Sequence, residues 1–127
     1  MPNQSKIDLN LHLDSNDLLF LHPSDHAWMI LVAKLFDRSN FGAWRRVIAI
    51  ALSTKNKLGF VKGEVPKPRL NDPMAPFWQR CNDMITSWIL NVLSHDISKS
   101  VIYIESASQI WKELETRYSE TNGEKVY

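Results

Sequence analysis

PMAPFWQRCNDMITSWILNVL, residues 73–93, is the stretch that decides the fold of this 127-residue chain. Its apolar residues are adjacent or three to four positions apart, as on one broad stripe of an α-helix, and polar residues fill most of the gaps. A strand would alternate with period two, and this stretch does not. At about 1.5 Å per residue the helix is roughly 30 Å long, the width of a small domain. We therefore predict the central helix of a helical core, with this inner stripe: Phe77, Trp78, Cys81, Met84, Ile85, Trp88, Ile89, Val92 and Leu93.

Three more helices are predicted around it, near residues 41–55, 96–104 and 106–120. The last one is opened by a capping box, in which Ser106 and Gln109 satisfy each other's free N–H groups. Trp44, Trp88 and Trp111 fall on the inner faces of three helices, so we expect them to meet in one core, where replacing any of them by Ala costs about 3–5 kcal/mol. The inner face of the first of these helices is predicted to contain Phe41, Trp44, Val47, Ile48, Ala51 and Leu52.

The remaining segments are predicted to be less regular. Residues 29–36 are a short apolar run whose length and β-branching favour a strand. Residues 60–69 contain one glycine and two prolines and are predicted to be a loop, with Phe60 and Val61 placed to pair with that strand. Residues 1–17 are polar and are expected to form a flexible arm. The predicted fold class is all-α: a small bundle of about four helices with a short N-terminal β element.

Composition limits the class of protein. A hydrophobic content of 44% and a formal charge of +1 indicate a folded domain, here residues 18–127, that is not strongly basic. The single cysteine is typical of a reducing compartment. Neither an apolar run of about 18 residues nor a hydrophobic signal region is found, so we expect a soluble cytoplasmic protein without a membrane partner.

Few residues suggest chemistry of their own. His22, Asp25 and His26 are close in sequence, but a zinc site needs a fourth ligand or a structured open position, and a turn at Pro23, Ser24 and Asp25 is the favoured interpretation. Cys81 is expected to be a small buried hydrophobe. The sequence has no nucleophile elbow, dinucleotide fingerprint or phosphate-binding loop. We therefore predict no enzymatic activity, metal, cofactor or small-molecule substrate.

A basic segment is the remaining functional candidate. Residues 45–69 contain seven Lys or Arg and a single acidic residue, Glu64. Arg45, Arg46, Lys62 and Lys67 are therefore candidates to face RNA. A solvated surface explains the same charges, because no aromatic residues recur among them as stacking partners.

Several uncommon strings occur in a familiar order: NKLGFVKG at 56–63, WQRCNDM at 78–84 and IWKELETRYS at 110–119. Across residues 18–127 the chain resembles the N-terminal region of the Gag polyprotein of Copia-type LTR retrotransposons. The resemblance implies a structural, self-associating protein that assembles with other Gag chains into capsid-like particles around the RNA of the element. It also implies that this chain is a truncated, N-terminal part of a larger Gag domain. One cysteine is too few for the zinc knuckle that such proteins often contain.

Two departures from the family pattern are visible. Ala27 and Trp28 stand where the family usually has a small residue and glycine, and Arg38 stands where it usually has glycine. A glycine at the latter position implies a positive φ, which Arg38 adopts only at a cost. An inert remnant of an element is therefore a further interpretation, beside self-association and RNA binding.

Overall fold

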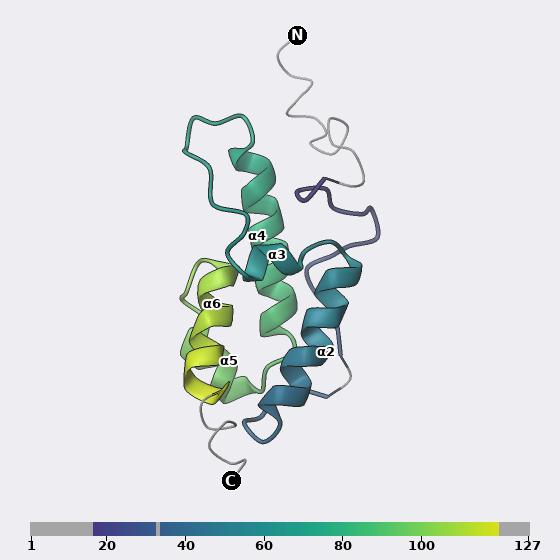
Figure 1. Cartoon of the computed structure of the whole chain (residues 1–127), viewed down its shortest axis with the longest axis vertical. Helices are drawn as coiled ribbons and strands as arrows, with labels where there is room; N and C mark the ends of the chain where they lie inside the picture. Colours follow the sequence, from purple (N-terminus) through teal and green to yellow (C-terminus); the bar gives the residue numbers. More distant parts are fainter. Residues whose placement is uncertain (1–16, 33, 120–127) are drawn as a thin grey trace.

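The computed structural model describes residues 17–32 and 34–119, and within them the chain is helical and has no strand (Figure 1). The predicted helical class is confirmed. Most of the predicted arm, residues 1–16, lies outside the described residues, as do residues 120–127. The elements are α2 (Phe41–Thr54), α3 (Leu58–Val61), α4 (Ala75–Leu90), α5 (His95–Val101), α6 (Ala107–Leu114) and a π-helical segment η2 (Glu115–Ser119).

Helix α4 is the predicted central helix, shorter by two residues at its start and three at its end. Pro76 lies in its first turn, where a missing N–H does little harm. The chain leaves the helix after Leu90, but Val92 and Leu93 remain buried in the turn that follows. The buried face of the helix contains Phe77, Trp78, Cys81, Asn82, Ile85, Trp88 and Ile89.

Helix α2 forms where its periodicity predicts it, but it is rotated relative to the predicted inner face. Phe41, Trp44, Ile48 and Leu52 are buried, whereas Val47, predicted to point inward, is 49% exposed. The buried positions follow one another at intervals of three or four, and Val47 falls outside that stripe. The buried stripe of α2 is thus narrower than the surface that its apolar residues cover.

The predicted strand at residues 29–36 is not confirmed. Among the described residues of that run only Phe36 is paired, in an isolated parallel bridge to Leu93. Phe36 N–H donates to Val92 O at 2.9 Å, and Ser94 N–H donates to Phe36 O at 2.9 Å. The segment runs beside the α4–α5 connection and meets no strand edge, so one residue is all that pairs.

The loop predicted at residues 60–69 begins later than expected. Phe60 and Val61 do not pair with the N-terminal run but belong to α3, where both are buried. A four-residue helix leaves little periodicity to detect, and its formation depends on burying these two side chains. Helix α3 was therefore not predicted from the sequence.

Aromatic rings fill the core between α2 and the C-terminal helices. Phe36 contacts Trp44 at 5.1 Å and Tyr118 at 4.9 Å between ring centroids, and Trp44 contacts Trp111 at 6.0 Å. Trp88 is also fully buried, but its indole N–H donates to His26 O at 2.7 Å, which places it under the N-terminal segment. All three predicted core tryptophans are buried, two of them in ring contact with each other.

The start of α6 is fixed by two side chains. Ser106 Oγ accepts a hydrogen bond from Gln109 N–H at 3.4 Å, which is the Ser106 half of the predicted capping box. The return bond from the Gln109 side chain is not formed among the described residues. Asn82 of α4, fully buried, instead accepts from Ala107 N–H at 2.9 Å and donates to Glu105 O at 2.9 Å. This amide therefore ties the central helix to the beginning of α6.

Arg38 adopts a φ of +88°, the conformation that a glycine would occupy without strain. Its guanidinium donates to Asp96 at 2.7 Å on the surface. Both groups are exposed, so water screens this ion pair. The turn before α2 is therefore formed as a glycine would form it, in spite of the arginine.

We predict that Asn82→Ala lowers the free energy of unfolding by about 2–4 kcal/mol, because it leaves the buried N–H of Ala107 and the partly buried carbonyl of Glu105 without their partner. Chemical denaturation followed by circular dichroism measures the change. The matched control is Gln79→Ala on the exposed face of the same helix, expected within about 0.5 kcal/mol of wild type. Equal effects of the two substitutions would contradict this role for Asn82.

Candidate functional site

The four basic residues predicted to face RNA do not form one cluster. Arg45 and Arg46 are on α2, Lys62 directly follows α3, and Lys67 lies in the loop before α4. Lys67 is placed above the ring of Trp78, with Nζ 5.8 Å from its centroid. Arg45 and Lys62, in contrast, line the same surface hollow.

Arg45 is already neutralised within the fold. Its Nε donates to Glu115 Oε2 at 2.7 Å, and its guanidinium lies 5.7 Å from the ring centroid of Trp111. An arginine held by a carboxylate and an aromatic face has little charge left for a phosphate unless that pair opens. Its role in the structure is to join α2 to the C-terminal helices.

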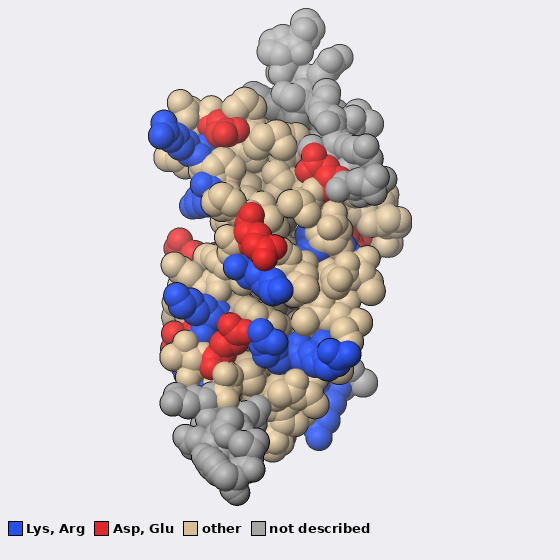
Figure 2. Space-filling model, in the orientation of Figure 1, with Lys and Arg blue, Asp and Glu red and all other residues tan. Residues whose placement is uncertain are grey.

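The hollow beside Arg45 has a volume of about 630 Å³ and lies between α2, the end of α3 and α6. Lys62 and Lys112 line it without an ion pair among the described residues, and Glu64 and Glu115 line it as well. Figure 2 shows blue Lys and Arg side chains gathered across the middle of this face, with red carboxylates among them. The electrostatic character of the hollow is mixed, with a small excess of positive charge.

Sequence reasoning missed Lys112. It lies far from residues 45–69 along the chain, and only the packing of α6 beside α3 brings it to the same hollow. The signal that was available is its position next to Trp111, whose indole was predicted to be inward. The residue after an inward residue on a helix lies near the edge of the exposed face.

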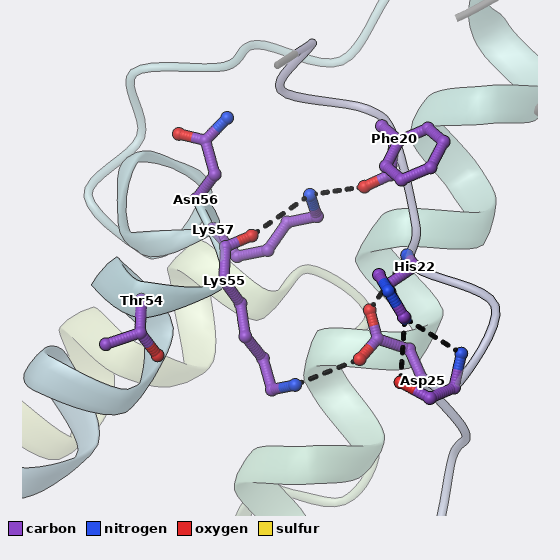
Figure 3. A pocket seen from close by; sticks show the side chains of 8 residues that line it. Phe20, His22, Asp25, Thr54, Lys55, Asn56 and Lys57 are labelled. Carbon is purple, nitrogen blue, oxygen red and sulfur yellow. Dashed lines mark hydrogen bonds and ion pairs between the residues drawn. The ribbon is translucent and has the colours of Figure 1, made fainter. Parts of the chain in front are cut away.

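Two other cations of the basic segment act inside the fold. Lys57 is only 2% exposed, and its Nζ donates to Phe20 O at 2.5 Å (Figure 3). Burial lowers the pKa of Lys57, because the charged form loses hydration. Lys55 pairs with Asp25 at 2.9 Å and lies 5.2 Å from the ring centroid of Trp88. The formal charge of residues 45–69 therefore overstates what the surface offers to a partner.

The residues around His22 form the predicted turn. Asp25 N–H donates to His22 O at 2.9 Å, and Asp25 Oδ2 accepts from His22 N–H at 3.1 Å. His22 Nδ1 is 2.8 Å from Ser24 Oγ, so its ring is used within the turn. Within residues 17–32 and 34–119, no three His, Cys, Asp or Glu side chains gather closely enough to hold a metal ion.

Cys81 is buried and faces the N-terminal segment, where its thiol donates to Leu19 O at 3.0 Å. Burial raises the pKa of this thiol to about 11, so at neutral pH it is protonated and a poor nucleophile. The arrangement is that of a structural cysteine.

An apolar surface on α2 is the other feature that the fold leaves uncovered. Val47 and Ile50 are each about half exposed, and they lie three positions apart on the outer side of the helix. The opposite side contains the buried Phe41, Trp44, Ile48 and Leu52. A helix that is apolar on both sides is normally covered on both sides.

Comparison with known families gives one result. Residues 22–69 match the family described as Gag-polypeptide of LTR copia-type. The matched segment contains the turn at His22, α2 and α3, and the resemblance to Copia-type Gag is thereby confirmed over these residues. No curated protein and no solved structure matches the chain. Among the described residues, no helix is both long and apolar enough to cross a membrane.

We predict that Cys81 makes the protein less stable at alkaline pH. Its folded-state pKa of about 11 is above the ordinary value of 9.0, so its contribution to stability is complete below pH 9 and is lost as the pH rises towards 11. The lowered pKa of Lys57 acts in the opposite direction, because there the unfolded chain holds its proton longer.

Comparison of wild type with Cys81→Ala separates these effects, because Lys57 is present in both. The difference in free energy of unfolding between the two proteins should shrink between pH 8 and pH 11, measured by urea denaturation. A difference that stays constant over this range would show that the thiol titrates normally.

Proposed function

We propose that this chain is a non-enzymatic Gag-like structural protein that associates with further copies of itself. The match of residues 22–69 to Copia-type Gag supports a structural role of this kind. The observation that carries self-association is the exposed apolar side of α2, which contains Val47 and Ile50. An apolar surface of this kind is typical of protein–protein contact.

The composition of α2 strengthens this proposal. In FGAWRRVIAIALST the only charged residues are Arg45 and Arg46, and the helix has no acidic residue. A helix on the surface of a monomer usually has a polar outer side. Here the outer side has apolar residues where a monomer would have charged ones, and a second Gag chain is the partner that the family match favours.

Light scattering after size exclusion, at protein concentrations from about 5 to 500 µM, tests self-association. We expect the mass of the wild-type chain to rise with concentration, and Ile50→Asp to move the rise to at least tenfold higher concentration, because a charge then has to be buried. Asn71→Asp is the matched control, since it adds the same charge at an exposed polar residue outside α2. A wild-type chain that stays monomeric throughout would overturn the proposal.

RNA binding is the second candidate function, and one observation favours it. Arg46, Lys62 and Lys112 are exposed, make no ion pair among the described residues, and line two hollows that both include Arg45. Cations that are free of carboxylates are available to phosphates.

Fluorescence anisotropy with a single-stranded RNA oligonucleotide tests it over a range of salt concentrations. If RNA binds here, Lys62→Gln and Lys112→Gln each weaken binding and reduce the slope of log affinity against log salt by about 1. Lys99→Gln, an exposed cation on α5, is the control and leaves the slope unchanged. Absence of binding at physiological salt would exclude this function for the chain alone.

A further inference from the structure

A small apolar hollow lies beside Val47, at the N-terminal half of α2. Its volume is about 220 Å³, and Val32, Ala43, Trp44 and Val47 line it together with Lys34 and Asn40. Four of these six residues are apolar, so the hollow suits an apolar or aromatic side chain. This open hollow has room for about one side chain and is called the socket below.

Asn40 gives this socket an unused polar group. It occupies the N-cap position of α2, yet its side chain makes no capping hydrogen bond. Its Oδ1 is buried and has no hydrogen-bond partner among the described residues. An unsatisfied amide oxygen is costly, and because this one is closed to solvent, a donor in the socket reaches it only after the Asn40 side chain turns toward the socket.

Lys34 gives the rim of the socket a positive charge. It is exposed and makes no ion pair among the described residues. Asp37 is its acidic neighbour along the chain: hydrogen bonds from the Ser39 hydroxyl and backbone lower the pKa of that carboxyl, and the charge of Lys34 helps to lower it. Lys34 makes no direct ion pair with it, so a carboxylate from elsewhere has room to pair with Lys34.

The connection between α5 and α6 has the matching set of groups. Tyr103 is 92% exposed, Ile102 next to it is 50% exposed, and Glu105 is exposed without an ion pair among the described residues. The ring of Tyr103 supplies an apolar body, its hydroxyl supplies a donor, and Glu105 supplies a carboxylate two residues away. Trp28 is also exposed, but Asp25, the acidic residue near it, is already paired with Lys55.

The two surfaces belong to different sides of the molecule. In Figure 1, α2 lies on one side of the helical body, and α5 and the start of α6 lie on the other. A contact between Tyr103 and this socket therefore requires another copy of the chain. When two chains join through two different surfaces, one chain still has a free socket and the other a free Tyr103 surface. Further chains can therefore add to both ends of the pair.

We propose that Tyr103 of one chain inserts into the socket formed by Val32, Asn40, Ala43, Trp44 and Val47 of a second chain, with Glu105 pairing to Lys34. This contact rests on the proposed self-association and names the surfaces that make it. The ring packs on the apolar walls, and the hydroxyl donates to the amide oxygen of Asn40 once that side chain has turned toward the socket. Assembly by this contact is head to tail.

A complementation experiment on the full chain tests the contact. Tyr103→Asp removes the inserted residue but leaves the socket intact, and Val47→Asp does the reverse. Each variant alone should stay monomeric at concentrations where wild type associates. Mixed in equal amounts, they should form dimers that do not grow. In each dimer the intact socket of the Tyr103→Asp chain binds Tyr103 of the Val47→Asp chain, and the other two surfaces are disabled. A symmetric contact of α2 with α2 would give no rescue in the mixture.

Smaller substitutions test the polar part. Tyr103→Phe should weaken association about three- to tenfold through loss of the hydroxyl, and Glu105→Lys and Lys34→Glu should each weaken it alone but partly restore it when mixed. Leu70→Asp, at an equally exposed apolar residue outside both surfaces, is the control and should leave association within about twofold of wild type. Circular dichroism confirms that each variant is folded.

The outcomes separate the two proposals. A wild-type chain that remains monomeric overturns self-association and this contact together. A wild-type chain that associates while Tyr103→Asp associates equally well overturns the contact alone. A mixture of Tyr103→Asp and Val47→Asp that stays monomeric, although wild type associates, also overturns the head-to-tail arrangement.

Discussion

Hydrogen bonds to the N-terminal segment are the constraint on which the rest of the structure depends. Residues 19–27 have no regular secondary structure, so their carbonyl groups that face the protein need donors from other elements. Side chains of α4, the turn after it and the α2–α3 connection supply these donors, which fixes where those elements lie. The pairs are Cys81 with Leu19 O, Lys57 with Phe20 O, Trp88 with His26 O, and Asn91 with Ala27 O. A buried lysine and a buried cysteine, which suggest chemistry in a sequence, are used here to hold a backbone in place.

The fold was predictable from sequence where a local pattern determines it. The apolar stripes of α2 and α4 are long, and helix geometry alone requires them to face one way. The predictions failed for segments whose structure depends on distant partners. Residues 29–36 would need a strand edge, which the described residues do not provide. Helix α3 forms where Phe60 and Val61 are buried. The positive φ of Arg38 was implied by the family pattern and by no property of arginine itself. Local physics thus gave the helices, and tertiary contacts decided the rest.

The candidate site was predictable only in part, because sequence counts charges without showing what neutralises them. Lys55 and Lys57 are paired or buried, and Arg45 is held by Glu115 and Trp111. Lys112 joins Lys62 at the same hollow from another helix, which no spacing along the chain reveals. The apolar side of α2 was hidden in a different way: periodicity placed Val47 in the core, and only the rotation of the helix exposes it.

The segment that matches Copia-type Gag is held by residues outside it. Residues 22–69 include α2 and α3 but not α4, and the indole of Trp44 donates to Val92 O beyond the matched segment. The residues that follow the turn at His22 are likewise held from outside the segment: Trp88 donates to His26 O and Asn91 donates to Ala27 O. The socket beside Val47 lies inside the matched segment, whereas Tyr103 lies outside it. The surface that the family match covers therefore depends on α4 for its shape, and the occupant proposed for it, the α5–α6 connection of a second chain, lies outside the match.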